Sequence, residues 1–255
     1  MNICLFSQSE INNPLSLKDE RAQHLIKVLH KKPGDTFTAG IIGGKSGLAT
    51  ITSIDENICF SFEEKGDGKP LTALRMIIGF PRPIQLKRLL RDIAALGVCQ
   101  VHLTGTELGE KSYMQSNLVE KGAAYKMLLD GTVQAGSTHV PELFLHKTLT
   151  ECLEECERSI KETCKNPPAR LALDNINPKM SLNDALGQSS GQTETGDKRA
   201  VFAAIGSERG WTDKERKLLE DFSYVRCGMG SRIMRTETAA TVAGSIILNS
   251  LGYLK

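Results

Sequence analysis

The chain has 255 residues and a formal net charge of +2, with 40% hydrophobic and 24% charged residues. That length suffices for one large domain with a smaller companion, and the near-neutral charge excludes a polycationic nucleic-acid coat while leaving room for local basic patches. No apolar run reaches the roughly 18 residues that a membrane span requires, and the N-terminus lacks the order of a signal peptide. We therefore expect a cytoplasmic globular protein that contacts no membrane.

The seven cysteines are expected to be reduced thiols in that compartment. Cys152 and Cys156 recur with Leu149 and Ile160 at helical spacing, which predicts a buried helix face, and Cys164 follows in the same segment. A zinc site would show paired CxxC spacings with partner ligands, which this chain lacks. The sequence therefore predicts that no metal is bound.

The first seventy residues are typical of a small antiparallel barrel or sheet. Residues 21–30 carry apolar side chains at helical spacing, and Pro33 with Gly34 ends that helix. Short β-branched or aromatic runs follow at 36–42, 48–54 and 57–63, and residues 65–70 predict a linker. Gly44-Lys45-Ser46 ends like a phosphate loop, but Ala39 stands where that motif needs glycine, so we interpret the segment as a hairpin turn.

From residue 71 the pattern alternates between strands and helices. Apolar strands are predicted at 74–80, 98–104, 170–174, 200–206 and 222–228, with helices at 84–96, 117–133 and 150–161. Residues 183–199 are rich in Ser, Gly, Gln and Thr and predict a mobile loop. This order indicates an α/β domain with a mainly parallel sheet covered by helices on both faces.

Two basic patches are candidates for RNA binding. The first lies before the Pro33-Gly34 turn and the second around the start of the helix at 84–96. The residues concerned are Lys27, His30 and Lys31 in the first patch, and Arg82, Lys87 and Arg88 in the second. Each patch alone is also compatible with a solvated protein surface.

Unusual sequence follows three of the predicted strands, and parallel sheets bind ligands beyond the carboxyl ends of their strands. These segments begin at Asp174, at Gly206 and at Met229. No GxGxxG follows the first strand, which argues against a dinucleotide-binding domain. Thr212 and Glu215 form a capping box that starts the next helix.

The C-terminal segment brings polar residues together where a helix begins. Arg235, Thr236, Glu237 and Thr238 precede an alanine-rich apolar stretch. A helix start leaves backbone N–H groups unsatisfied and favours negative charge nearby. We therefore expect a ligand with both polar and apolar faces at this position.

Five motifs carry a resemblance to a known family. HLIKVLHKKPGD, AALGV, VPEL, IGSERGWTDKE and GSRIMRTETAA occur in this order, and together they resemble the ribosomal RNA small subunit methyltransferase E family. The resemblance implies an enzyme that uses S-adenosylmethionine to methylate N3 of a uridine in small-subunit (16S) ribosomal RNA. The partner would be this RNA or the assembled small ribosomal subunit.

The resemblance also implies a fold and a set of site residues. Residues 1–70 would form a PUA-like β-barrel of RNA-binding type, and residues 71–255 a SPOUT-type methyltransferase domain with a C-terminal deep trefoil knot, working as a homodimer. Arg235 and Glu237 would be catalytic. The cofactor-binding residues would be Leu173, Asp174, Ile205, Gly206, Glu208, Gly210, Met229, Gly230, Arg232, Ile233, Met234 and Thr238.

Departures from the family pattern leave alternatives open. Ala95, Leu108 and Val133 stand where the family has other residues, and the turn at 206–211 has Ser207, Arg209 and Trp211 where the family usually has GPEGGF. One alternative is a catalytically altered RNA-binding or ribosome-assembly protein on the same fold. The other is a methyltransferase that acts on a different RNA site.

Overall fold

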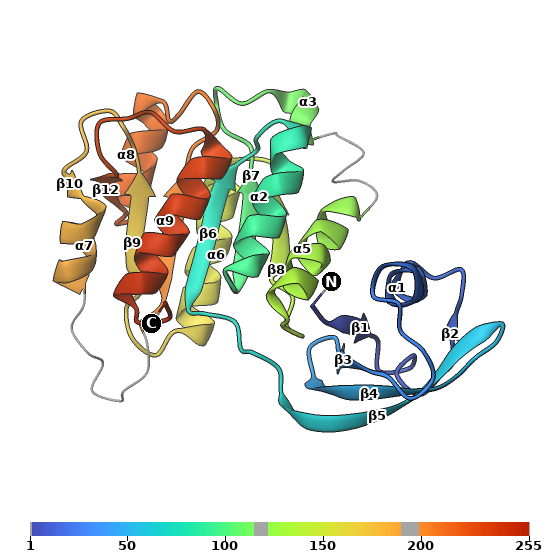
Figure 1. Cartoon of the computed structure of the whole chain (residues 1–255). Helices are drawn as coiled ribbons and strands as arrows, with labels where there is room; N and C mark the ends of the chain where they lie inside the picture. The colour runs from blue at the N-terminus through green and yellow to red at the C-terminus, as the bar shows by residue number, and fades with distance from the viewer. Residues whose placement is uncertain (1, 115–121, 190–198, 255) are drawn as a thin grey trace. The chain divides into compact units, whose positions relative to one another are not determined.

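The computed structural model describes residues 2–114, 122–189 and 199–254. The chain forms two compact units, of which the first comprises Met1–Leu71 and Leu129–Val140, and the second Thr72–Leu128 and Pro141–Lys255 (Figure 1). Helix α5 (Ala123–Ala135) begins in the second unit and ends in the first. Among the described residues, no helix is long and apolar enough to cross a membrane.

The first unit is built on a five-stranded curled sheet. In spatial order its strands are β1 (Cys4–Phe6), β3 (Thr36–Ile41), β4 (Lys45–Ile54), β5 (Asn57–Asp67) and β2 (Leu15–Ser16). The three strands predicted at 36–63 are confirmed, whereas the short strands β1 and β2 were not predicted. The predicted linker at 65–70 is wrong in part, because β5 pairs with β4 as far as Asp67.

The helix predicted at 21–30 is shorter than its apolar pattern suggests. It consists of α1 (Glu20–Gln23), continued by a π-helical turn at His24–Val28. The Arg21 guanidinium holds this segment in place by pairing with Asp19 at 2.8 Å and Glu10 at 3.0 Å while lying over the Phe6 ring. These contacts join the helix to β1, so a short and irregular helix is kept by tertiary interactions.

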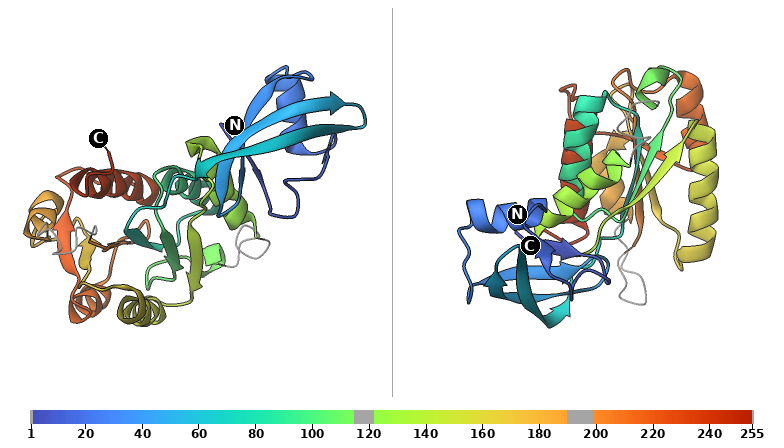
Figure 2. Two further views of the ribbon diagram at one scale, coloured as in Figure 1. Left: turned by 90° about the horizontal axis from the view of Figure 1, so that it is seen from below. Right: turned by 90° about the vertical axis from the view of Figure 1, so that its right-hand side faces the viewer.

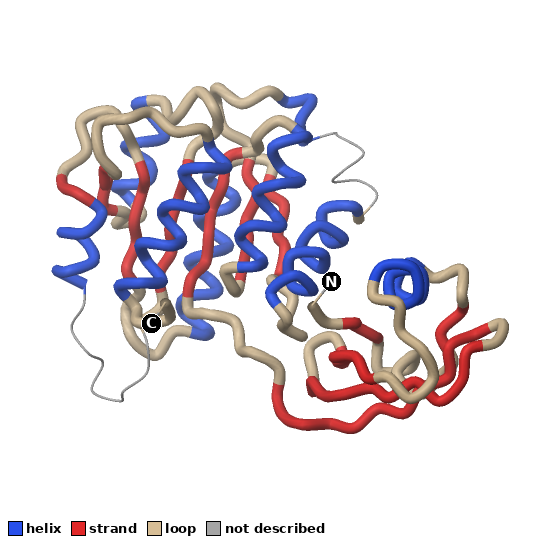
Figure 3. Tube along the Cα trace, in the orientation of Figure 1, coloured by secondary structure: helices blue, strands red, loops and turns tan. Residues whose placement is uncertain are grey.

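The second unit contains a seven-stranded parallel sheet (Figure 3). In spatial order the strands are β10 (Met180–Ser181), β12 (Val225–Gly228), β9 (Ala169–Leu173), β11 (Val201–Ile205), β6 (Leu74–Gly79), β7 (Gln100–Thr104) and β8 (Glu142–His146). The predicted parallel sheet is confirmed. Strands β8 and β10 were not predicted, and β12 starts later than expected because Phe222 caps the preceding helix.

Helices cover both faces of this sheet (Figure 2). One face carries α2 (Pro83–Ala95), α7 (Leu182–Ser189) and α9 (Thr236–Ser250), and the other α6 (Leu149–Thr163) and α8 (Asp213–Asp221). The short helix α3 (Lys111–Met114) follows β7. The capping box of Thr212 and Glu215 at the start of α8 is confirmed.

The loop predicted at 183–199 is wrong for its first part. Residues 182–189 form α7, because Leu182, Ala185 and Leu186 are buried at helical spacing. The rest of that loop, residues 190–198, lies outside the described residues. The helix predicted at 117–133 corresponds to α5, and its first five residues also lie outside the described part.

Small residues on α9 allow close packing within the chain. Ala240, Ala243 and Gly244 are buried. A Cβ atom added at Gly244 would lie 3.2 Å from Leu96 Cδ1 and 3.5 Å from Met76 Cε. The absence of that side chain therefore lets α9 approach α2 and β6, as ridge-and-groove packing with small residues permits.

Candidate functional site

A cavity of about 290 Å³ lies where three neighbouring strands end. Strands β12, β9 and β11 are adjacent and parallel, so the turns that follow them meet at the same edge of the sheet, near the start of α9 in Figure 1. The lining residues are Leu173, Asp174, Asn175, Ile176, Ile205, Gly206, Ser207, Glu208, Arg209, Gly210, Trp211, Cys227, Met229, Gly230, Arg232, Ile233, Met234, Thr236 and Ala239. This lining combines apolar side chains with exposed backbone and charged groups, as small-molecule sites do.

The turn after β11 requires glycine at two positions. Gly210 has a φ of 72° and donates its N–H to the carbonyl of Ser207 at 2.9 Å. A Cβ atom at Gly206 would lie only 3.0 Å from the carbonyl carbon of Gly210. The turn is therefore folded back tightly, which leaves its backbone accessible from the cavity.

Two hydrogen bonds tie the three turns together. The buried indole of Trp211 donates to the carbonyl of Leu173 at 3.1 Å, which joins the turns after β11 and β9. The Thr236 hydroxyl donates to the carbonyl of Gly206 at 3.2 Å, which joins the start of α9 to the turn after β11. The cavity walls are thus fixed by contacts between segments far apart in the sequence.

The Asp174 carboxylate already has partners within the protein. It pairs with Arg216 Nε at 2.7 Å and lies 3.8 Å from Arg226, and it accepts a hydrogen bond from the backbone N–H of Ile176 at 3.0 Å. Its side chain is only 1% exposed. Asp174 therefore shapes the turn after β9, although it also lines the cavity.

Glu208 connects the turn after β11 to the segment that precedes α2. One of its carboxylate oxygens accepts a hydrogen bond from the backbone N–H of Arg82 at 3.2 Å, and the same oxygen lies 3.6 Å from Arg82 Nε. The guanidinium of Arg82 remains exposed beside this contact. One of the predicted RNA-binding residues is therefore linked to a wall of the cavity.

The two predicted catalytic residues lie at the start of α9. Arg235 is its N-cap and makes no side-chain capping bond, and its guanidinium has no ion pair with any described residue. Glu237 is 9% exposed, and its Oε2 atom is buried with no hydrogen-bond partner in the described part of the chain. Neither side chain lines the cavity, but their neighbours Thr236 and Ala239 do.

All the predicted cofactor residues except Thr238 line this cavity, and Thr238 is exposed on α9. The list of predicted cofactor-binding residues omitted Asn175, Ile176, Ser207, Arg209, Trp211, Cys227 and Ala239, which line the cavity as well, although Ser207 and Arg209 lie within the predicted loop at 206–210. Most of them could have been predicted from the sequence, because they lie within or directly beside the motifs that supplied the predicted residues.

The predicted RNA-binding residues belong to two different units. Lys27 and His30 are exposed and Lys31 is partly exposed in the first unit, close in sequence to the exposed apolar Val28 and Leu29. Arg82, Lys87 and Arg88 are all exposed around the start of α2 in the second unit.

Comparison with known proteins identifies the family. The model of the RNA methyltransferase domain matches residues 68–248. The chain is 38% identical to the ribosomal RNA small subunit methyltransferase E of Treponema pallidum (strain Nichols), over 97% of this chain and 91% of that protein. The chain belongs to the ribosomal RNA small subunit methyltransferase E family. The resemblance noted in the five motifs is thus confirmed.

Two further relatives support membership of the methyltransferase E family. The ribosomal RNA small subunit methyltransferase E 1 of Borreliella burgdorferi (strain ATCC 35210 / DSM 4680 / CIP 102532 / B31) is 31% identical over 98% of each chain. The fold is similar to the crystal structure of a ribosomal RNA small subunit methyltransferase E from Neisseria gonorrhoeae bound to S-adenosyl methionine. That likeness has a TM-score of 0.73 at 20% identity and covers 98% of this chain and 97% of the other.

Proposed function

We propose that this protein transfers the methyl group of S-adenosylmethionine to N3 of a uridine in small-subunit (16S) ribosomal RNA. The observation that carries the proposal is the cavity formed by the turns after β9, β11 and β12 in a chain of this methyltransferase family. With an rRNA substrate, the enzyme would act in the cytoplasm.

The cavity residues suit S-adenosylmethionine, whose adenine ring faces and methylene groups are apolar and whose sulfonium and amino-acid end are charged. Leu173, Ile205 and Met234 offer apolar contacts, while the glycine turn at 206–210 offers backbone groups. The volume of about 290 Å³ lies near the lower end of the range for small-molecule sites. When bound, the cofactor supplies a methyl group on a sulfonium that leaves as a neutral thioether.

Arg235 and Glu237 have complementary roles in this proposal. A bond forms from uridine N3 to the methyl carbon while the carbon–sulfur bond breaks, and N3 loses its proton. Glu237, whose Oε2 atom lacks a partner among the described residues, accepts that proton or orients Arg235. The exposed guanidinium of Arg235 stabilises negative charge that develops on the uracil carbonyl oxygens.

The proposal extends to RNA binding and assembly. The curled five-stranded sheet of the first unit supports a PUA-like barrel, and the basic groups at Lys27 to Lys31 and at Arg82 to Arg88 would contact phosphates. We also propose the SPOUT-type trefoil knot. It is supported by the hydrogen bond from the Thr236 hydroxyl to the Gly206 carbonyl, which joins the start of α9 to the turn after β11.

A homodimer completes the proposal. Ile233 and Ile176 both line the cavity although they are 83% and 51% exposed, and a second copy of the chain would cover these apolar side chains. Light scattering of the purified chain measures this directly, since a monomeric mass at micromolar concentration contradicts the dimer.

Methylation of small ribosomal subunits from cells that lack this gene tests the proposed reaction. Nucleosides from the treated rRNA are analysed by mass spectrometry, and we expect 3-methyluridine. Arg235→Ala should lower turnover about 10²- to 10³-fold, and Glu237→Gln about 10²- to 10⁴-fold. Lys217→Ala, an exposed change on α8, is the matched control and should retain full turnover.

Cofactor binding measured by calorimetry, RNA binding and the position of the transferred methyl group together separate the alternatives that the sequence left open. Wild type and both active-site variants should bind S-adenosylmethionine, because neither Arg235 nor Glu237 lines the cavity. Binding of small-subunit RNA without methyl transfer would favour an RNA-binding or assembly protein. Transfer to any atom other than uridine N3 would instead favour a methyltransferase of different specificity.

A further inference from the structure

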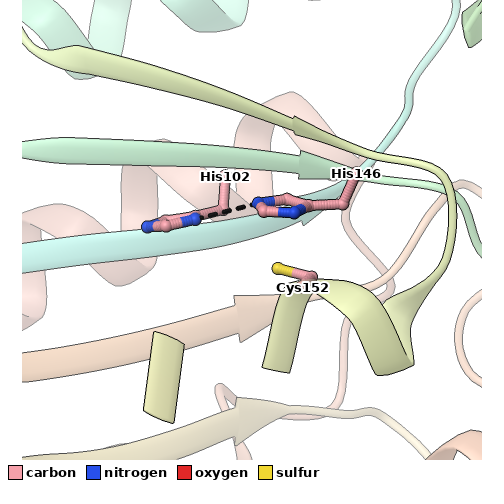
Figure 4. Close-up of side chains that lie close together, drawn as sticks. All are labelled: His102, His146 and Cys152. Carbon is pink, nitrogen blue, oxygen red and sulfur yellow. Dashed lines mark hydrogen bonds between the residues drawn. The ribbon is translucent and has the colours of Figure 1, made fainter. Parts of the chain in front are cut away.

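Imidazole and thiol groups are buried together on the α6 side of the sheet. His102 comes from β7, His146 from the end of β8, and Cys152 and Cys156 from successive turns of α6 (Figure 4, which draws the first three). All four side chains are essentially inaccessible to solvent. None of them lines the cavity described above.

The donor atoms of this cluster lie close to one another. Nδ1 of His102 is 3.1 Å from Nε2 of His146 and 3.9 Å from the Cys156 sulfur. Donor atoms of His102, His146 and Cys152 all lie within 4.8 Å of one another. In Figure 4 the Cys152 sulfur points from α6 toward the two rings.

We propose that His102, His146, Cys152 and Cys156 form a zinc site. Two imidazoles and two thiolates are a donor set of structural zinc, which is tetrahedral with Zn–N near 2.0–2.1 Å and Zn–S near 2.3 Å. Those bond lengths put nitrogen donors about 3.3 Å apart and nitrogen and sulfur about 3.6 Å apart. The 3.1 Å between the two ring nitrogens and the 3.9 Å between the Cys156 sulfur and His102 Nδ1 lie close to these values.

The charge of the site suits its surroundings. Two thiolates neutralise Zn²⁺, so the complex can be buried among apolar groups without an uncompensated charge. Cys152 and Cys156 belong to the core cluster that also contains Phe202 and Leu153. The thiols are one helical turn apart on α6 and therefore face the same side.

The position of Glu155 supports this assignment. Its carboxylate lies 3.7 Å from His146 Nδ1, the ring nitrogen that points away from His102. In the described structure that buried nitrogen has no hydrogen-bond partner. With Nε2 bound to zinc, Nδ1 carries a proton and points it at a carboxylate, which is the usual outer partner of a histidine ligand.

Such a site would be structural. Its four protein ligands complete a tetrahedron, which leaves no open position for water or substrate. It would fasten α6 to β7 and β8, and the free energy of metal binding would add to the stability of the second unit. The inference is independent of the proposed methyl transfer, since no residue of the cavity takes part.

Two measurements on the full-length chain, purified without a histidine tag, test the proposal. They are its metal content and its cobalt spectrum. We expect one zinc ion per chain. Replacement by Co²⁺ should give a thiolate-to-cobalt charge-transfer band and the intense visible bands of tetrahedral cobalt. Chelation of the metal should lower the thermal unfolding temperature.

Variants locate the metal. Cys152→Ala and Cys156→Ala should abolish the charge-transfer band or weaken cobalt affinity by more than the about 10- to 100-fold expected for Glu155→Gln. Cys164→Ala, at the C-terminal cap of the same helix, is the matched control and should bind cobalt like wild type. The absence of the band in wild type overturns the proposal, as does a band of wild-type intensity with wild-type cobalt affinity in both cysteine variants. Because the wild-type titration decides by itself, a variant that fails to fold does not remove the test.

Discussion

Replacing Asp174 by asparagine should destabilise the second unit strongly. The change removes the charge from a side chain that is 1% exposed and leaves Arg216, 12% exposed, without its 2.7 Å partner. Loss of one member of a buried pair costs about 3–5 kcal/mol, and Arg216 would keep only the exposed carboxylate of Asp213 as an ion-pair partner. The nearby Arg226, 3.8 Å away, loses a favourable interaction as well.

Asp213 supplies a matched control for that change. It pairs with the same Arg216 guanidinium at 2.8 Å, but its side chain is 98% exposed. Asp213→Asn should therefore cost less than about 1 kcal/mol, as exposed ion pairs do. Urea unfolding monitored by Trp211 fluorescence gives both free energies, since this indole lies in the same unit. Equal losses for the two variants, or a loss below about 1 kcal/mol for Asp174→Asn, would refute the reasoning.

Three further outcomes follow from other parts of the molecule. Gly244→Val should destabilise by about 1–3 kcal/mol, because the added atoms meet α2 and β6, and thermal unfolding measures the loss. Trp211→Phe removes the indole hydrogen bond to the Leu173 carbonyl and should weaken S-adenosylmethionine binding in calorimetry; unchanged affinity would show that this bond does not shape the cavity. Hydrogen bonding to Arg21 lowers the pKa of Asp19, so the pair stabilises the fold fully above about pH 4 and loses that effect as the pH falls through the lower folded-state pKa. Arg21→Met should accordingly reduce stability in urea at pH 7 and much less at pH 2, and a pH-independent difference would contradict this account.

The pattern of apolar residues predicted the second unit well because its strands are buried on both faces. Runs such as 201–205 are fully buried, and continuous apolar runs of this length are typical of parallel strands. Glycine and polar residues directly after these runs then marked the cavity edge, since every parallel strand ends at the same side of the sheet. The site could be located from these two signals before any relative was considered.

Other features could not be predicted from the local sequence pattern. Strand β8, with the sequence ELFLH, has only three consecutive apolar residues, and they are half-buried or exposed, so it lacks the longer apolar run that marked its neighbours. Segment 182–189 has the composition of a loop and becomes helical because Leu182 and Leu186 find a buried surface. The approach of His102 and His146 to the cysteines of α6 depends on the pairing of β7 with β8, which the spacing of cysteines along the chain does not encode.

The start of α9 departs in two ways from an ordinary helix N-terminus, and both departures cost stability. Arg235 takes the N-cap position, where Ser, Thr, Asp or Asn normally caps the backbone, and its positive charge opposes the helix dipole. The Oε2 atom of buried Glu237, which has no hydrogen-bond partner among the described residues, carries a desolvation cost of about 1–3 kcal/mol. In the proposed reaction, a bound base that develops negative charge beside the guanidinium and releases a proton toward the carboxylate would relieve both costs at once. The free energy would then be held in groups that are oriented before the substrate arrives, which is how a site can stabilise a transition state more than a ground state.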